Sequence, residues 1–474
     1  MSKHFLEYFR CPANYVDFRL AGELPPEPGF FHVGPDLTCY GRISVGQACH
    51  ESSSQLDDVS SALRIEKNVC VLPFDLDEVV ENLRFERYDG ATPAGRSITN
   101  GLGRKTYYAM RPFLPTSVRK YLQRMALRGW ESASFPRWPV DQTVDRLFDR
   151  MMACVIRAHR GERVPFIWFW PDGYSACATM THDVETAVGR DFCGTLMDLD
   201  DAFGIKSSFQ VIPEARYEVS DQFLHSIRER GFEINVHDFN HDGDLFRDRE
   251  EFLRRVARIN DYGRKFRSAG YRSAVLYRNL DWYEFFDCSY DMSVPNVGHL
   301  DPQHGGCCTT KPYFIGKILE IPVVATQDYT LFNILGQCSM DLWEEQIKLV
   351  RDQHGLISFI VHPDYLLDKP ARDLYSTLLA RLDQLRRQST MWIPLPRELN
   401  DWWRSRNEMR LVKEGNAWQI EGPEKHRARI AYASLDGDRV IYNFDPKFGP
   451  PRNSIATQGP LESTLTKVEQ NKGL

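Results

Sequence analysis

The sequence predicts an α/β fold: a distorted (β/α) barrel with an N-terminal extension and a small C-terminal β-rich module. Two observations support this prediction. Between residues 166 and 400, short apolar runs alternate with longer amphipathic segments, which is typical of parallel strands covered by helices. Seven or eight such strand–helix units in about 235 residues suit a barrel better than an open sheet.

The individual elements follow from local patterns along this segment. The expected strands are short runs rich in β-branched and aromatic residues, at 175–182, 206–213, 232–237, 271–277, 289–294, 317–324, 355–362 and 390–395. The expected helices have apolar residues three and four positions apart, at 191–203, 221–231, 249–266, 341–353 and 374–388. The order of these elements favours a largely parallel sheet.

The region before the barrel, residues 1–165, is rich in loop signals and contains no chemical motif. Its residues 91–130 include eight Lys or Arg and no Asp or Glu. Residues 115–130 predict a basic amphipathic helix. Such a helix, here within 111–130, can contact an anionic membrane or an anionic glycan. The alternative, which we favour, is an ordinary helix with a solvated basic face.

The region after the barrel, residues 401–474, has a different sequence pattern. Three short β-like runs, NAWQIEG, ARIAYASL and DRVIYNFD, are separated by Gly and Asp. They predict a small antiparallel module that ends near residue 445. The Gly-, Pro- and polar-rich tail from residue 446 is expected to be loose.

Composition excludes several classes of protein. The chain of 474 residues is 42% hydrophobic and 12% aromatic, so it can form a sizeable core and is not disordered throughout. Its net charge of -6 argues against nucleic-acid binding. No apolar run approaches the roughly 18 residues of a membrane span. We see no signal peptide either, and therefore expect a cytoplasmic protein.

Cysteine usage agrees with a reducing compartment. The chain has 11 cysteines, an odd number, and none forms a CxxC pair. A disulfide scaffold would be small, dense and evenly counted. We therefore expect reduced and mostly buried thiols. Cys307 and Cys308, which follow two glycines, could have a redox or metal role, but packing is the preferred interpretation.

Chemically versatile residues follow several of the predicted strands. In a (β/α) barrel, functional side chains gather at the C-terminal ends of the strands. The residues at these ends are Asp183, Glu185, His237, His241, Arg272 and His362. Singly, each has an ordinary explanation, such as a helix N-terminus, a solvated histidine pair, a salt bridge or a core histidine. Their joint placement at one rim favours a functional site.

Five motifs in order over residues 166–400 resemble those of the polysaccharide deacetylases of the NodB-homology type, carbohydrate esterase family four. The first reads THDVE and the second HDFNH. The third is a strand that contains Arg272. The fourth, a degenerate segment with an aspartate, is similar to FDCSYDMS at 286–293. The fifth is the apolar run LISFIVH, which ends at His362.

This resemblance implies a metal-dependent hydrolase that removes N-acetyl groups from an amino-sugar-containing glycan. Glu185, His237 and His241 would match the ligands of one divalent metal ion, for which Zn²⁺ is the preferred choice. The bound ion would lower the pKa of water and polarise the acetyl carbonyl. A site of this kind keeps coordination positions open for water and substrate.

The resemblance also implies the roles of the remaining rim residues. Asp183 would match the catalytic base, and Arg272 would hold it in position and ionised. His362 would protonate the departing sugar nitrogen. Asp364, close to His362 in the sequence, is a candidate for raising the pKa of that histidine.

The chain departs from the family pattern at three positions. Glu185 replaces the usual aspartate, which still permits metal binding because Glu is a normal Zn²⁺ ligand. Ser273-Ala274 follow Arg272, so the proline of the third motif is missing. His182 stands where an aromatic residue is frequent; it could perturb Asp183, but a packing role is the default.

Other functions remain open at this point. The same scaffold could hydrolyse another C–N bond, or the chain could be a glycan-binding pseudoenzyme. A carboxylate-pair glycosidase would need two carboxylates at least about 5 Å apart across the scissile bond, and that interpretation leaves the histidines unexplained. Without a signal peptide, the expected substrate is a biosynthetic intermediate such as a lipid-linked or nucleotide sugar.

Overall fold

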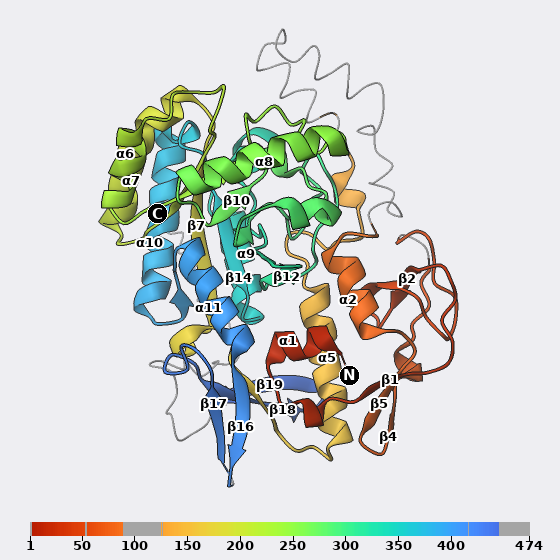
Figure 1. The fold of residues 1–474 in the computed structure, drawn as a ribbon. Coiled ribbons are helices and arrows are strands. Elements are labelled where there is room, and N and C mark those ends of the chain that lie inside the picture. Colours follow the sequence, from red (N-terminus) through yellow and green to blue (C-terminus); the bar gives the residue numbers. More distant parts are fainter. Residues whose placement is uncertain (1, 53–54, 89–124, 126, 416, 445–474) are drawn as a thin grey trace, which may run out of the picture.

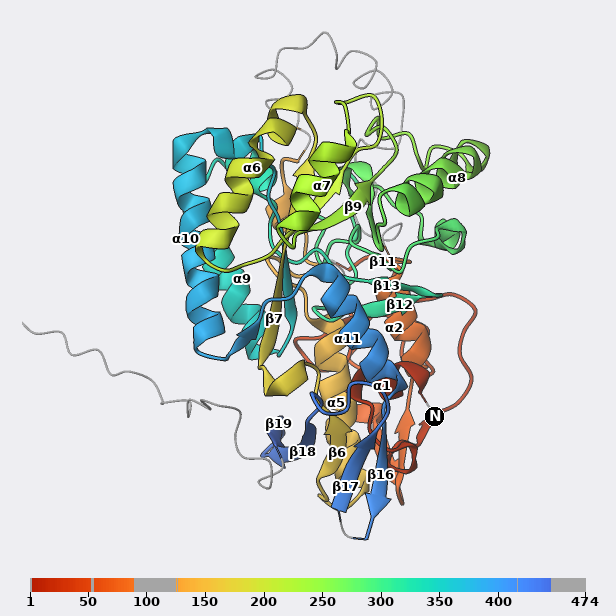
Figure 2. The ribbon, with the colours of Figure 1, turned by 60° about the vertical axis from the view of Figure 1, so that its left-hand side comes forward.

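The computed structural model describes residues 2–52, 55–88, 125, 127–415 and 417–444. Its central feature is a curled nine-stranded sheet (Figures 1 and 2). The strand order is β12-β13-β11-β10-β9-β8-β7-β14, and β15 also pairs with β7. All neighbouring strands are parallel except β12 and β13. The predicted α/β class is therefore confirmed.

All eight strands predicted for the barrel are present. They are β7 (Ala176–Val184), β8 (Ser208–Val211), β9 (Glu233–His237), β10 (Gly270–Arg272), β11 (Tyr290–Asp291), β13 (Ile318–Glu320), β14 (Leu356–Ile360) and β15 (Met391–Trp392). The antiparallel edge strand β12 (Tyr313–Ile315) was not predicted. The strand expected at 271–277 ends at Arg272, because Val275 and Leu276 take left-handed backbone conformations (φ 58° and 55°) that no strand accommodates.

The five predicted barrel helices are also present. They are α6 (Ala187–Ala202), α7 (Asp221–Glu229), α8 (Arg249–Lys265), α9 (Asp341–Asp352) and α10 (Lys369–Arg387). Three of them begin at side chains that accept a hydrogen bond from the first turn: Thr186, Ser220 and Asp248. Such caps satisfy otherwise unpaired N–H groups. Because Thr186 caps α6, this helix begins immediately after Glu185.

The sheet curls without a continuous ladder between its two ends. The gap between β13 and β14 is bridged by the irregular segment 322–325. The backbone N–H of Ala325 donates to the Ser358 carbonyl over 3.1 Å, and that of Val324 donates to Ser358 Oγ over 3.1 Å. The fold is therefore a distorted, incompletely closed barrel.

The N-terminal region lies beside one end of this sheet (Figure 1). Its elements are α1 (Lys3–Phe9), β1 (Phe18–Leu20), β2 (Gly29–His32), β3 (Thr38–Gly41), β4 (Arg64–Glu66), β5 (Val69–Leu72), α2 (Leu76–Arg84), α5 (Thr143–Ala158) and β6 (Val164–Ile167). They form a three-stranded sheet, β1-β5-β4, and the hairpin β2-β3. Helix α5 buries most of its apolar face.

The C-terminal part begins with α11 (Pro396–Glu408), so residue 400 lies inside a helix. It continues with β16 (Arg410–Glu414), β17 (Ala417–Glu421), β18 (Ile430–Asp436) and β19 (Arg439–Phe444). Strand β18 pairs with β6 as well as with β19. Phe9, Phe166 and Tyr442 pack ring against ring. N-terminal and C-terminal residues thus share one core.

Several expectations fall outside the described residues. The basic block at 91–130, with its proposed membrane contact at 111–130, lies there except for residue 125 and residues 127–130. These last residues form turns and the start of a short 3₁₀ helix. The tail from residue 446 also lies outside. Within the described part, no helix is both long and apolar enough to cross a membrane.

The unusual cysteine pair has no accessible thiol. Cys307 and Cys308 are both buried. Burial raises the pKa of both thiols, and a thiol held in its neutral form is a poor nucleophile and metal ligand. The preferred packing interpretation agrees with this environment.

Candidate metal and catalytic site

Strand β7 sends consecutive side chains to opposite faces of the sheet, as strands do. On the inner face, Arg272 Nη1 donates to Thr181 Oγ1 over 2.9 Å and to Asp183 Oδ1 over 2.6 Å. On the outer face, His182 contacts the carboxylate of Asp200, 3.2 Å from Nε2 to Oδ2. His182 therefore has a packing role and points away from Asp183.

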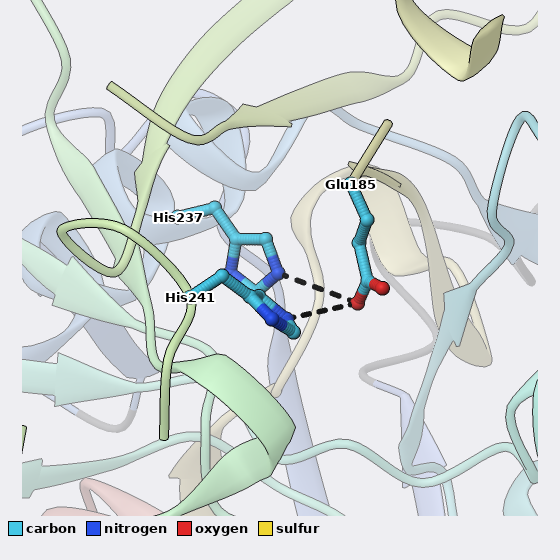
Figure 3. A group of neighbouring side chains, drawn as sticks. All are labelled: Glu185, His237 and His241. Carbon is cyan, nitrogen blue, oxygen red and sulfur yellow. Dashed lines mark ion pairs between the residues drawn. The ribbon is translucent and has the colours of Figure 1, made fainter. Parts of the chain in front are cut away.

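Three side chains with metal-ligand chemistry converge at the end of β7 and β9 (Figure 3). Glu185 follows β7, His237 ends β9 and His241 lies in the next loop. Their ligand atoms all lie within 4.8 Å of one another. Glu185 Oε1 is 2.9 Å from His241 Nε2 and 3.9 Å from His237 Nε2. The structure thus brings together the three residues that the resemblance implied as ligands.

The two imidazoles present nitrogen atoms that lack well-aligned hydrogen-bond partners. Among the described residues, neither His237 Nε2 nor His241 Nε2 makes a well-aligned hydrogen bond, although both atoms are buried and each forms an ion-pair contact with Glu185 Oε1. Buried polar atoms are seldom left without a partner. His237 Nδ1 lies 3.2 Å from the carbonyl oxygen of Arg272, which can only accept, so the proton is on Nδ1. The lone pair of His237 Nε2 therefore points into the cluster, as metal ligation requires. His241 Nδ1 lies 3.2 Å from Arg216 Nη2, which can only donate, so neutral His241 carries its proton on Nε2 and a metal ion bound there would displace it.

One carboxylate and two imidazoles suit Zn²⁺ and other divalent transition metals. The Glu185 side chain is 26% exposed, whereas that of His237 is 1% exposed. The cluster is therefore open on the carboxylate side only. His241 pulls the pKa of Glu185 well below its usual value, against the effect of burial, so the carboxylate is ionised.

Asp183 lies next to this cluster but does not belong to the three-residue group. Its Oδ2 is 3.7 Å from His237 Nε2, while its Oδ1 is bound by Arg272. Burial opposes ionisation of Asp183, but the buried guanidinium of Arg272 lowers the pKa of this carboxyl below its usual value. One oxygen is thus fixed and the other faces the site.

His362 reaches the cluster from the loop after β14, with Nε2 3.5 Å from Glu185 Oε1. Its Nδ1 is 2.6 Å from Asp328 Oδ1, and its backbone N–H donates to Asp328 Oδ2 over 2.7 Å. Burial favours the neutral imidazole, but Asp328 and Glu185 raise the pKa of His362 well above its usual value. This environment favours the protonated imidazole.

The carboxylate hydrogen-bonded to His362 is thus that of Asp328, whereas Asp364 interacts with His362 through charge only. Asp364 Oδ1 packs against the start of α6, where a Cβ at Gly189 would lie 2.4 Å from it. The segment proposed as the fourth motif does not supply the carboxylate either, because its Asp291 is buried beside Tyr283 and Ser293. No local sequence signal points to Asp328, because it lies eight residues beyond the end of β13.

Two tyrosines form an aromatic wall beside His362. The rings of Tyr365 and His362 have centroids 5.2 Å apart, and those of Tyr329 and Tyr365 are 5.9 Å apart. Both tyrosines are partly exposed. No motif in the sequence singled them out, because both lie in short helical turns without an apolar repeat.

Comparisons with known proteins give structural similarity only. No family model matches the sequence, and no curated protein matches it. A Mycobacterium smegmatis protein described as a polysaccharide deacetylase is 17% identical, with a TM-score of 0.41 over 53% of this chain and 98% of that chain. An allantoinase is 11% identical, with a TM-score of 0.39 over 49% and 92%.

A third similar structure is a family 4 acetyl xylan esterase from Clostridium thermocellum in complex with a cobalt ion. It is 15% identical, with a TM-score of 0.31 over 48% of this chain and 91% of that chain. All three TM-scores are below 0.5. The function proposed below therefore rests on the geometry of the site.

Proposed function

We propose that the protein is a metal-dependent hydrolase that removes N-acetyl groups from an amino-sugar-containing glycan or glycan precursor. The observation that supports it is the convergence of two buried imidazole nitrogens and the carboxylate of Glu185 on one point, beside an aspartate held by Arg272. Hydrolysis of an amide needs an activated water, a stabilised oxyanion and an acid for the leaving amine. The site has a candidate group for each.

Glu185, His237 and His241 would hold the metal ion, with Zn²⁺ as the preferred identity. When bound, such an ion supplies a Lewis acid that polarises a carbonyl and makes water more acidic. The three side chains bring one negative charge, so the loaded site keeps a net positive charge. That charge favours the carbonyl oxygen of an acetyl group over an apolar substituent.

Asp183 would act as the general base. Arg272 occupies Oδ1, which leaves Oδ2 to accept the proton of the attacking water. The same guanidinium also donates to Thr181 Oγ1 and to the Met292 carbonyl, so its position is fixed by acceptors on two segments, β7 and the residue after β11. A base held this way loses little freedom on reaction.

His362 would act as the general acid. Its Nδ1 donates to Asp328, so the proton that leaves is the one on Nε2, the atom that faces Glu185. Transfer of this proton to the sugar nitrogen converts it into an amine leaving group. Asp328 keeps the ring oriented throughout.

The aromatic wall of Tyr329 and Tyr365 is the proposed contact for the sugar ring. Partly exposed tyrosines offer a flat apolar face and a polar hydroxyl, which match the apolar C–H face and polar rim of a pyranose. The wall stands beside His362, where the leaving nitrogen has to be placed. Lipid-linked and nucleotide sugars are the first substrates to assay.

The decisive experiment compares the wild type with the double variant His237→Ala, His241→Ala after metal-replete preparation. We expect about one Zn²⁺ per chain in the wild type and none in the variant, with loss of acetate release from N-acetylated sugars. The matched control is His225→Ala, His426→Ala, because both histidines are exposed. Equal zinc content in the wild type and the double variant would contradict the proposal that Glu185, His237 and His241 bind a metal ion.

A second outcome separates metal binding from the reaction. If the wild type binds Zn²⁺ but releases no acetate from any N-acetylated substrate, the proposed deacetylase activity is wrong. The proposed metal site would still be supported. Release of a different acid from another amide would then indicate hydrolysis of another C–N bond. Tight glycan binding without turnover would indicate a binding protein.

A further inference from the structure

The loop between β8 and α7, residues 212–220, supplies none of the proposed metal ligands. It nevertheless contacts both chain segments that carry them. One contact comes from Tyr217, which reaches the end of β7 next to Glu185. The other comes from Arg216, which reaches the loop that ends in His241.

The Tyr217 hydroxyl stands between two strands at the point where their pairing ends. It donates to the Val184 carbonyl over 2.7 Å and accepts from the Ile212 N–H over 3.0 Å. The last paired residues of β7 and β8 are Val184 and Val211. The hydroxyl thus links the two strands by hydrogen bonds just beyond their last backbone pair. Val184 lies between Asp183 and Glu185, so this bond fixes the backbone that presents both carboxylates.

Arg216 makes the corresponding contact on the histidine side. Its Nη2 donates to the His241 carbonyl over 2.6 Å, and its Nε donates to the Asn240 carbonyl over 3.3 Å. His241 has a left-handed backbone, with φ 57°, a conformation that a residue with a side chain keeps only when its surroundings impose it. The exposed arginine binds the two carbonyls on either side of the His241 peptide nitrogen.

We infer that Tyr217 and Arg216 are positioning residues that set the separation between Glu185 and His241 and thereby determine the affinity for the divalent metal ion. The inference rests on the metal site of the proposed function. Arg216 Nη2 also lies 3.2 Å from His241 Nδ1, so this residue orients the ligand ring as well as its backbone. In the described structure neither side chain forms a hydrogen bond or an ion pair with the carboxylate of Glu185.

The loop has a separate anchor that these two contacts do not provide. Glu214 accepts a hydrogen bond from Tyr262 Oη over 2.6 Å and pairs with Arg258, both on α8. This anchor holds the loop to the outer helix. The contacts of Tyr217 and Arg216 are therefore additional, and they are directed at the ligand segments.

The test uses single-atom and charge-conserving variants in the full chain. Tyr217→Phe removes the hydroxyl that bridges Ile212 and Val184. We expect the Zn²⁺ dissociation constant, measured by competition with a chelator, to rise about 10-fold, since residues that orient metal ligands typically contribute 10- to 100-fold. We also expect the visible absorption bands of the Co²⁺-loaded protein to shift, because they report ligand geometry.

The matched control is Tyr262→Phe, which removes a hydroxyl from the other anchor of the same loop. Its Zn²⁺ dissociation constant and Co²⁺ spectrum should equal those of the wild type, even if both variants lose some stability without metal. Equal shifts in the two variants, or no shift in either, would overturn the inference. With either result, a wild type that contains Zn²⁺ would still be consistent with the proposed function.

Arg216→Lys is the second variant, and it keeps the positive charge while losing the planar donor pair. We expect a rise of a few-fold in the Zn²⁺ dissociation constant. Arg190→Lys is its control, because Arg190 donates to the Glu218 carbonyl of the same loop over 3.1 Å and contacts no ligand segment. A wild type that binds no Zn²⁺ would contradict both the inference and the proposed metal, whereas a zinc-bound wild type without acetate release contradicts the proposed function alone.

Discussion

The two faces of β7 carry two buried groups of histidine and carboxylate that differ in one respect. On the outer face, His182 has partners at both ring nitrogens, the Val361 carbonyl at 3.1 Å and Asp200 at 3.2 Å. Asp200 in turn accepts from Ser207 and Tyr375. On the inner rim, His237 and His241 turn Nε2 atoms toward Glu185 at 3.9 Å and 2.9 Å, and neither atom makes a well-aligned hydrogen bond within the described structure.

Both groups combine histidine with a carboxylate, so the presence of these two chemistries does not distinguish them. The two groups differ in whether their buried polar atoms all have hydrogen-bond partners. A group that only stabilises the fold gains most when every buried donor and acceptor is paired. A group that binds an ion has to leave lone pairs converging on one point. The inner group does so, and the outer group does not.

The largest effect is expected at Asp183. Asp183→Asn keeps the size of the side chain and the contact with Arg272, but it removes the base. Acetate release should fall about 10²- to 10⁴-fold, as is usual for the loss of a general base. The Zn²⁺ content should stay at the wild-type level. Loss of the metal together with activity would make Asp183 a ligand and widen the inner group to four residues.

A smaller effect is expected at Asp328. Asp328→Asn removes the charge that holds His362 as a proton donor, and we expect turnover to fall about 10- to 100-fold with metal retained. Asp364→Asn is the control, because Asp364 lies nearby but makes no hydrogen bond to His362 in the described structure. A larger loss in the control than in Asp328→Asn would restore Asp364 as the partner of His362.

The same pair of aspartates shows where sequence reasoning succeeds and where it stops. Asp183, Glu185 and Arg272 could be predicted because they end or directly follow strands with clear apolar patterns, and such patterns are local. Asp328 could not, because it begins a short helical turn eight residues beyond the end of β13 and reaches His362 only through tertiary packing. Asp364 is closer in sequence, but sequence distance within a loop does not set side-chain direction.

The fold likewise has features that the sequence predicts and features that it does not. The predicted barrel strands are confirmed because each is a short apolar run that can be recognised alone. The pairing of β6 with β18 joins residues from opposite ends of the chain, and no local pattern indicates it. The end of β10 at Arg272 also depends on backbone conformations at Val275 and Leu276 that neither residue type favours.

The smallest effect on activity is expected on the outer face. Asp200→Asn weakens the bonds to His182, Ser207 and Tyr375, all of which are buried. The free energy of unfolding, measured in urea, should fall by about 1–3 kcal/mol, the usual consequence of impairing a buried charged partner. Acetate release and Zn²⁺ affinity at 25 °C should stay within about twofold of wild type, because the change lies on the other side of β7.

The comparison between the two faces depends on that separation. His182 and Asp183 are adjacent on one strand, so a shift of β7 would reach both. If folded Asp200→Asn lost more than about tenfold in Zn²⁺ affinity, the outer group would be acting on the inner one through the strand. Since β7 is paired on both sides, with β14 and with β8, we expect the strand to hold its position and the two groups to behave independently.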